Sequence, residues 1–213
     1  EEILSVFSEL DIPVATVANG ADARKSMDIN VDDQSAAAAM TRHLVAFGHS
    51  RIGFVRGPSD QVSSIRRETG FRMAMDEAGL SVFEQMCVNG QFTYRSGVDA
   101  AEQLLALEER PTAIFASNDD MAAAVIGVAH RHGLSVPEDL SVVGFDNSPS
   151  AISVWPELTT MDQPVSAMAA SAFNLVLSAI DERIVSREDA IAEQVHPCKL
   201  VKRESSGICR KQI

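Results

Sequence analysis

The sequence predicts an α/β protein in which a parallel sheet carries helices on both faces. Short apolar runs alternate with longer segments of helical periodicity, and glycine or proline residues separate them. The clearest example spans residues 112–147, where apolar runs at 112–116 and 140–145 flank a helical segment at 121–132. Polar residues follow both runs directly, which is typical of the sheet edge at which α/β proteins bind ligands.

The remaining elements follow from the same patterns, taken in chain order. Helices are expected at 1–10, 33–47, 63–78, 96–107, 121–132 and 164–180. Strands are expected at 13–18, 27–31, 51–56, 85–89, 112–116, 140–145 and 159–161, with a closing β-hairpin formed by 190–196 and 199–203. The segment 148–158 is expected to be an irregular loop, and the polar tail from residue 204 is expected to fray.

Capping residues set the expected helix ends. Aspartate or serine precedes three of the helices and glycine closes three, in agreement with the preferences of those positions. The expected N-caps are Asp32 or Asp33, Ser63 or Ser64, and Ser96, and the expected closing glycines are Gly48, Gly79 and Gly133. Pro164 stands at the first position of the last helix, where a backbone N–H would have no helical partner.

Composition and charge exclude several functions. The chain of 213 residues is 46% hydrophobic and 23% charged, which suits one large domain or two small lobes. Its net charge of −12 repels phosphate backbones, so we do not expect its own surface to bind nucleic acid. No apolar run reaches the roughly 18 residues that a membrane-spanning helix needs. Three scattered cysteines, Cys87, Cys198 and Cys209, indicate a reducing compartment, and we expect a cytoplasmic protein.

The sequence contains no pattern typical of an enzyme active site or a metal site. It lacks the G-x-S-x-G, P-loop, G-x-G-x-x-G and H-E-x-x-H motifs. The histidines show no metal-ligand spacing and are expected to be solvated or capping residues: His43, His49, His130, His132 and His196. Asp119 and Asp146 share the sheet edge and could form an acid–base pair, but no nucleophile or cofactor cradle accompanies them. We therefore expect neither catalysis nor a bound cofactor or metal.

A second interpretation of the same edge is a small-molecule site. A sugar needs carboxylate and amide groups that bond hydroxyls in pairs, an arginine fork and an aromatic face. The strand ends and helix starts supply such a set: Ser63, Arg67, Phe92, Asn118, Asp146 and Gln163. Structural alternatives remain, because Asn118 and Asp146 could serve only as caps and Phe92 could belong to the core. Arg67 could likewise pair on the surface with Glu68 or Glu77.

Several long motifs resemble those of the LacI/GalR family of bacterial transcription regulators. They are RIGFVRGP at 51–58, RETGF at 67–71, AGL at 78–80, RPTAIFASNDDMA at 110–122, GLSVPEDLSVVGFDN at 133–147 and PELTTMDQP at 156–164. The motifs occur in order and at matching spacing, and the resemblance covers essentially the whole chain.

The resemblance implies two α/β lobes similar to those of periplasmic sugar-binding proteins, joined by three crossover strands with the ligand between them. Mapped onto this chain, 30–162 and 195–213 form a C-terminal effector lobe, and 1–29 and 163–194 form a remnant of an incomplete N-terminal lobe. The family's helix-turn-helix DNA-binding domain has no counterpart here, so the sequence resembles an N-terminally truncated regulator.

The resemblance also implies a function. Phe92 would stack on the ligand ring, Arg67 and Asp146 would bind its hydroxyls, and Ser63, Asn118 and Gln163 would complete the polar shell. The implied protein is a repressor that binds a sugar, or less typically a nucleobase, and that acts as a homodimer. It would reach operator DNA only through the missing N-terminal domain. Ala18 departs from the pattern, because some members carry aspartate there. A periplasmic sugar-binding protein is the alternative.

The helix at 121–132 allows two interpretations of its packing. It is apolar around most of its circumference, and a helix of that kind is buried on two sides. One side would face the sheet. The other would face either a second subunit or a neighbouring helix of the same chain.

Overall fold

The computed structural model describes residues 13–18, 27–182 and 193–210. The helix expected at 1–10 lies outside the described residues. The chain divides into two compact units, a smaller one of Glu1–Asp32 with Pro164–Pro197 and a larger one of Asp33–Gln163 with Cys198–Ile213. The assignment of the larger unit as an effector lobe stays a prediction.

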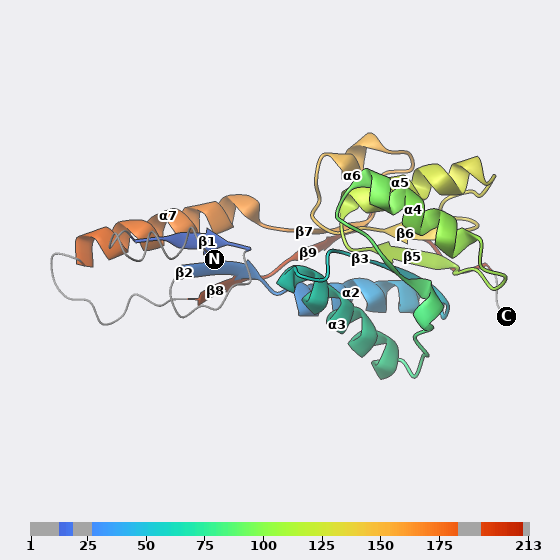
Figure 1. The fold of residues 1–213 in the computed structure, drawn as a ribbon, viewed down its shortest axis with the longest axis horizontal. Coiled ribbons are helices and arrows are strands. Elements are labelled where there is room, and N and C mark those ends of the chain that lie inside the picture. The colour runs from blue at the N-terminus through green and yellow to red at the C-terminus, as the bar shows by residue number, and fades with distance from the viewer. Residues whose placement is uncertain (1–12, 19–26, 183–192, 211–213) are drawn as a thin grey trace. The chain divides into compact units, whose positions relative to one another are not determined.

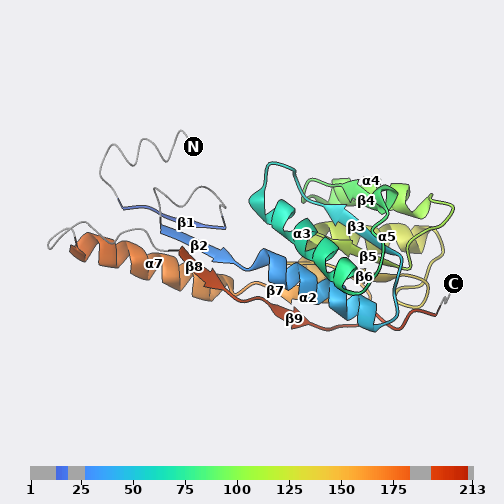
Figure 2. The ribbon, with the colours of Figure 1, turned by 90° about the horizontal axis from the view of Figure 1, so that it is seen from below.

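The larger unit is built on a parallel sheet with the strand order β4-β3-β5-β6 (Figures 1 and 2). Its strands are β3 (Ile52–Arg56), β4 (Cys87–Asn89), β5 (Ala113–Ala116) and β6 (Ser141–Val143), and a short 3-10 helix (Glu84–Met86) leads into β4. Because the strands run the same way, their carboxyl ends share one edge. The polar residues that follow β5 and β6 therefore come to the same edge.

Helices cover both faces of this sheet, as the alternating sequence pattern predicts. On one face, α2 (Asp33–Ala46) packs against α3 (Val62–Glu77). On the other face, α4 (Tyr94–Leu105) packs against α5 (Asp119–Arg131), as Figure 1 shows. The predicted fold class, an α/β architecture with a parallel sheet between helical layers, is confirmed.

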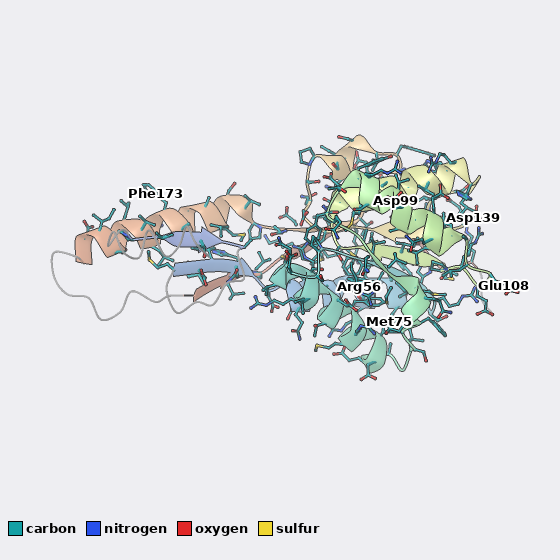
Figure 3. All side chains as sticks on the ribbon, in the orientation of Figure 1. Arg56, Met75, Asp99, Glu108, Asp139 and Phe173 are labelled. Atoms are coloured by element: carbon teal, nitrogen blue, oxygen red, sulfur yellow. The ribbon has the colours of Figure 1, made fainter. Side chains whose placement is uncertain are left out.

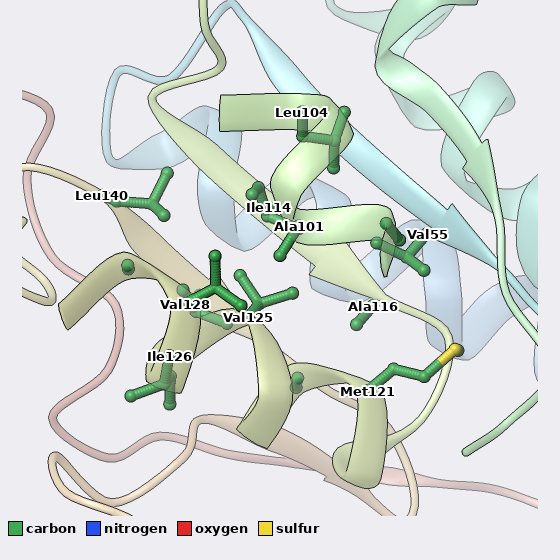
Figure 4. Packing of buried hydrophobic residues seen from close by; sticks show 14 of the residues in the cluster. Val55, Ala101, Leu104, Ile114, Ala116, Met121, Val125, Ile126, Val128 and Leu140 are labelled. Atoms are coloured by element: carbon green, nitrogen blue, oxygen red, sulfur yellow. The ribbon is translucent and has the colours of Figure 1, made fainter. Parts of the chain in front are cut away.

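Each face of the sheet has its own hydrophobic core. Under α2 and α3, Phe54 stacks on Phe71 with ring centroids 4.7 Å apart and meets Phe115 edge-on at 5.3 Å. Under α4 and α5, Ile114 and Val125 belong to a second cluster (Figure 4). Adjacent residues of β5 thus point to opposite cores, as the two-residue period of a strand requires.

Two glycines allow the helix pairs to approach each other closely. A Cβ atom on Gly70 of α3 would overlap the backbone oxygen of Gln34 in α2. A Cβ atom on Gly97 of α4 would lie 2.6 Å from the Cα of Met121 in α5. Larger residues at either glycine would force the paired helices apart, which is a costly form of overpacking.

The segment between β6 and β7 is more ordered than expected. It contains a short helix, α6 (Ser150–Ser153), which packs on α5. The prediction of an irregular loop over 148–158 is therefore wrong for the residues of α6. After it, β7 (Thr160–Asp162) pairs antiparallel with β9 (Lys199–Val201).

The tail from residue 204 does not fray within the described residues. Ser205 is fully buried, and its hydroxyl donates to the carbonyl oxygen of Val142 at 2.6 Å and accepts from the N–H of Thr159 at 2.8 Å. Further along, the N–H of Cys209 donates to the carbonyl oxygen of Phe47 at 2.8 Å. The expectation was wrong because local polarity does not reveal that a hydroxyl satisfies backbone groups of distant elements.

The smaller unit holds a second parallel sheet. Its strands β1 (Ala15–Val17), β2 (Met27–Val31) and β8 (Glu193–His196) run in the order β1-β2-β8, and α7 (Val165–Glu182) packs on β1 and β2. Phe173 of α7 is 64% exposed (Figure 3). Within the described parts of the chain, no helix combines the length and apolarity that crossing a membrane requires.

The predicted closing hairpin is wrong. Residues 190–192 of its first arm lie outside the described residues, and the rest forms β8, which pairs in parallel with β2. The second arm forms β9, which pairs with β7. The two arms therefore belong to different sheets, because each finds its partner in a strand far away in the sequence.

Two helix starts also differ from the predicted caps. α3 begins at Val62 rather than at Ser63 or Ser64, and its N-cap residue makes no side-chain hydrogen bond. α4 is capped by Thr93, whose hydroxyl oxygen accepts from the N–H of Ser96 at 3.2 Å. Serine and threonine are both favourable caps, so composition alone does not choose between neighbouring candidates.

The apolar circumference of α5 is covered by its own chain. α4 and α6 both pack on it, and the side chains of Val125, Ile126 and Val128 are no more than 2% exposed. The intrachain alternative for this helix is therefore correct. The interpretation of the helix as a dimer surface is wrong, since its apolar residues have no face left for a second subunit.

Two histidines that were expected to be solvated are buried. His49 is 3% exposed, and its ring nitrogens lie 3.0 Å from the hydroxyls of Thr112 and Ser141. His43 is 8% exposed and lies 3.0 Å from the hydroxyl of Ser206. Burial lowers the pKa of both imidazoles, so both favour the neutral form.

Candidate functional site

The six candidate residues all belong to the larger unit and lie at or near the edge where its parallel strands end. Asn118 follows β5, Asp146 follows β6 and Gln163 follows β7. The other three come from the start of α3 and the loop before α4: Ser63, Arg67 and Phe92. Ser63 is half-buried and lies about one helical turn before Arg67.

Arg67 is the best-anchored side chain of the set, and only 5% of the residue is exposed. Its Nε donates to Oδ1 of Asp33 at 2.7 Å. Its Nη1 donates to the carbonyl oxygen of Ser117 at 2.6 Å and, more weakly, to Oδ1 of Asp146 at 3.4 Å. The guanidinium is thus fixed in one orientation before any ligand arrives.

Asp146 is held in an unusual backbone conformation. Its φ is 114°, a region that non-glycine residues rarely adopt. Its N–H donates to the carbonyl oxygen of Met161 at 2.9 Å, and its Oδ1 accepts from Nε2 of Gln163 at 2.6 Å. Burial raises the pKa of this carboxyl to about 6, although the charge of Arg67 acts in the opposite direction, and the nearby Asp119 raises the pKa further.

Two aromatic rings flank the guanidinium of Arg67. Its Cζ lies 3.7 Å from the ring centroid of Phe145 and 5.8 Å from that of Phe92. Phe92 is half-buried and has a φ of 55°. Its ring fills the space over Gly57, where any Cβ atom would overlap it. The arrangement combines a cation–π contact with an aromatic face that remains partly accessible.

Asn118 is engaged at both ends of its amide. Its Oδ1 accepts from the N–H of Met121 at 3.0 Å, which caps α5. Its Nδ2 donates to the carbonyl oxygen of Phe92 at 3.1 Å. The capping alternative for Asn118 is therefore correct, and a direct contact with a ligand stays a prediction.

Asp119 does not form the exposed acid–base partner that was considered for Asp146. Its residue is fully buried. Its Oδ1 accepts from the hydroxyl of Thr160 at 2.6 Å, and its Oδ2 accepts from the N–H of Ser148 at 2.7 Å. Asp119 thus ties α5 to β7 and to the loop after β6. No group of three or more potential metal ligands gathers anywhere in the described residues.

Sequence reasoning missed two residues that hold Arg67 in place. Asp33 was considered only as a helix cap, and Phe145 only as part of a buried strand. The surface alternative for Arg67 is wrong, because Glu68 and Glu77 pair with other arginines. A buried arginine needs a buried carboxylate, and this rule directs the search for a partner to the acidic residues of neighbouring elements.

Known proteins are similar to this chain in sequence. A model of the periplasmic binding protein-like domain matches residues 41–206. The HTH-type transcriptional repressor PurR of Salmonella paratyphi B is 38% identical over 208 residues, which span 96% of this chain and 60% of that repressor.

Solved structures of transcription regulators have a fold similar to that of this chain. The transcriptional regulator CelR in its cellobiose complex is 31% identical, with a TM-score of 0.86 over 94% of this chain and 61% of that one. A LacI family regulator from Enterococcus faecium with bound ribose is 25% identical, with a TM-score of 0.84 over 97% of this chain and 75% of that one.

The class that these matches define is the periplasmic binding protein-like α/β fold. The chain belongs to the periplasmic binding protein-like domain family, and the repressor and regulators named above are similar to it. It spans 60% of the length of the repressors it matches. These relatives are regulators rather than enzymes.

Proposed function

We propose that this chain is the effector-binding and dimerisation part of a ligand-responsive repressor. Its effector is a small molecule, a sugar in the first place and a nucleobase in the second. Ser63, Arg67, Phe92, Asn118, Asp146 and Gln163 are the proposed contact residues. The proposal depends chiefly on one observation, the contact of Arg67 with Asp146 at the sheet edge.

The geometry of that contact suits a hydroxyl-bearing ligand. Arg67 lies 2.7 Å from Asp33 but 3.4 Å from Asp146, so the second contact is the weaker one. A ligand hydroxyl can donate to Asp146 while another accepts from Arg67. Because the guanidinium is already fixed, little side-chain entropy is lost when the ligand binds. The partly accessible ring of Phe92 supplies an apolar face for a sugar or a base.

In the whole protein, the effector would act by binding one conformation better than another. That difference in affinity shifts the population of the DNA-binding form and so changes operator affinity. Operator contact would be made through an N-terminal domain outside this chain, because the net charge of −12 does not suit a phosphate backbone. A cytoplasmic location accords with the free thiols of Cys87 and Cys198.

The alternative of a periplasmic sugar-binding protein is not favoured, since the relatives named above are transcription regulators. The test uses the intact protein and its operator. A thermal-shift panel of sugars and nucleobases identifies the effector, and operator binding is then measured with and without it. Asp146→Asn should remove the response of operator binding to the effector. The control is Arg95→Ala, because Arg95 is 84% exposed and lies outside the proposed site.

An operator affinity that responds equally in the wild type and in Asp146→Asn would contradict the assignment of the site. An operator affinity that responds to no ligand of either class would contradict the proposed function itself.

A further inference from the structure

We propose that Arg203 is a positioning residue of the candidate site: through the side-chain amide of Asn147, it holds the backbone turn that aims the carboxylate of Asp146. The inference rests on the proposed function and adds to it a residue that acts on the site from the C-terminal segment of the chain. Arg203 lies 56 residues after Asn147, so no local sequence signal connects the two.

The backbone turn at Asp146 and Asn147 needs support from its surroundings. The φ angle is 114° at Asp146 and 54° at Asn147, so two consecutive residues other than glycine adopt positive φ. Such conformations are uncommon outside glycine and persist only where neighbouring groups hold them. Because these angles set the direction in which Cβ of Asp146 leaves the chain, they also set the direction of its carboxylate.

The side-chain amide of Asn147 supplies part of this support, and its two ends bond to different elements. Its Nδ2 donates to Oδ1 of Asp162 in β7 at 2.8 Å, and its Oδ1 accepts from Nη2 of Arg203 at 2.7 Å. A guanidinium only donates and a carboxylate oxygen accepts, so the two partners fix the orientation of the amide. Asn147 is thus clamped between β7 and the segment that follows β9.

Arg203 is itself anchored, and its side chain is only 16% exposed. Its Nη1 donates to the carbonyl oxygen of Leu158 at 2.7 Å, and its Nε lies 3.6 Å from Oε2 of Glu157. The backbone N–H of Arg203 donates to the hydroxyl of Thr159 at 2.9 Å. Since a guanidinium is rigid and planar, these contacts also fix the Nη2 that reaches Asn147.

Backbone contacts hold the turn along β7. The N–H of Asn147 donates to the hydroxyl of Thr160 at 3.3 Å, and the N–H of Asp146 donates to the carbonyl oxygen of Met161 at 2.9 Å. Both acceptors belong to β7, the strand that also holds the amide of Asn147 through Asp162. The bond from Arg203 therefore acts on the turn at the residue directly after Asp146.

The turn decides where the carboxylate of Asp146 lies. Its Oδ1 lies 2.6 Å from Nε2 of Gln163 and 3.4 Å from Nη1 of Arg67. Without the bond from Arg203, the amide of Asn147 can rotate and the backbone can relax toward negative φ, which residues other than glycine prefer. The carboxylate would then swing away from Gln163 and Arg67 toward solvent.

The pKa of Asp146 distinguishes this positioning role from a direct effect of charge. Burial is the main cause that raises the pKa of this carboxyl to about 6. The charge of Arg203 lowers the pKa of the nearby Asp119, so the loss of that charge alone would raise carboxyl pKa values here. A carboxylate that swings into solvent would instead return toward the ordinary aspartate pKa of about 3.9. The two explanations thus predict opposite shifts.

The test measures the pKa of Asp146 by nuclear magnetic resonance in the intact protein, with carbon-13 in the aspartate carboxyls and with Asp146→Asn to assign the signal. Arg203→Gln removes the guanidinium. Asn147→Ala removes the amide but leaves the other contacts of Arg203, so it remains informative where Arg203→Gln is less stable. The control is Arg210→Gln, because Arg210 belongs to the same C-terminal segment and its side chain is 70% exposed.

We expect the pKa of Asp146 to fall by about one unit in both Arg203→Gln and Asn147→Ala and to stay unchanged in Arg210→Gln. Because Arg203 acts through Asn147, the double variant should show no larger fall than either single variant. An unchanged or higher pKa in Arg203→Gln, or falls that add up in the double variant, would overturn the inference.

A second measurement connects the position of Asp146 to effector binding. The same variants are titrated calorimetrically with the panel of sugars and nucleobases, including cellobiose, ribose and adenine. For a probe that changes the operator affinity of the wild type, Arg203→Gln should bind about tenfold more weakly and Arg210→Gln equally well. Equal affinity in Arg203→Gln and the wild type overturns the inference. If the wild type responds to no probe, the proposed function fails, and the pKa of Asp146 still decides whether Arg203 positions it.

Discussion

Removal of Asp33 should destabilise the protein as strongly as removal of a large core side chain. The Asp33→Ala change leaves the guanidinium of Arg67, a residue only 5% exposed, with the Ser117 carbonyl and the 3.4 Å contact to Asp146. Breaking a buried ion pair by removing one partner costs about 3–5 kcal/mol, because the other charge stays buried. Asp146 can move closer and compensate in part, so we expect a loss near the lower limit, about 3 kcal/mol.

The assay is urea unfolding of the intact protein, followed by far-ultraviolet circular dichroism and extrapolated linearly to water. Asp33→Asn keeps an acceptor for Arg67 but removes the charge, so its loss should be about half as large. Asp76→Ala is the control, because Asp76 is exposed on α3 and its removal should change the free energy of unfolding very little.

If the free energy of unfolding of Asp33→Ala lies within about 1 kcal/mol of that of the Asp76→Ala control, the Arg67–Asp33 pair behaves like an exposed one and the reasoning is refuted.

The same reasoning affects the choice of variants for binding assays. Arg67→Ala would break the buried ion pair with Asp33, so a loss of ligand binding in that variant would mix instability with a lost contact. Asp146→Asn avoids this difficulty.

Three further predictions concern single positions. Gly57→Ala should push the Phe92 ring out of place, cost about 1–3 kcal/mol and weaken effector binding in calorimetric titration; unchanged affinity would show that the ring does not contact the effector. Asn118→Ala should lower the stability by about 1 kcal/mol in thermal unfolding, because the N–H of Met121 loses its acceptor, and an unchanged melting temperature would contradict the cap. Burial lowers the pKa of His49, so the stability that the neutral imidazole contributes is complete above the ordinary histidine pKa of about 6.5 and is lost as the pH falls below that value. His49→Gln should therefore flatten the pH dependence of the free energy of unfolding. Parallel curves for the wild type and the variant would contradict this.

Local sequence patterns were sufficient for most of the fold. The strand expected at 27–31 coincides with β2 (Met27–Val31), and the apolar run at 112–116 becomes β5 (Ala113–Ala116). Strands and helices of this kind are specified by residues a few positions apart, and their alternation determines the parallel arrangement. The polar residues after the strands could likewise be placed at one edge, because all strands of a parallel sheet end there.

Features that depend on distant partners could not be predicted in this way. β8 and β9 follow each other closely in the sequence, and their local pattern fits a hairpin, yet β8 pairs with β2 and β9 pairs with β7. Ser205 looks like a tail residue until its bonds to Val142 and Thr159 are known.

The same limitation applies to the candidate site. Asp33 lies 34 residues before Arg67, and no local signal connects the two. Phe145 stacks on the same guanidinium but reads in the sequence as one more buried strand residue. The position of Asn118, Asp146 and Gln163 after strands was therefore predictable from the sequence, whereas the residues that orient Arg67 were not.

The central claim is that the effector binds at the sheet edge formed by Arg67, Asp146 and Gln163. A crystal structure of the intact protein with its effector tests this most directly. We predict effector hydroxyls at hydrogen-bond distance, about 2.7–3.2 Å, from the guanidinium of Arg67 and the carboxylate of Asp146. An effector that binds elsewhere, with the contact between Arg67 and Asp146 unchanged at 3.4 Å, would contradict the account.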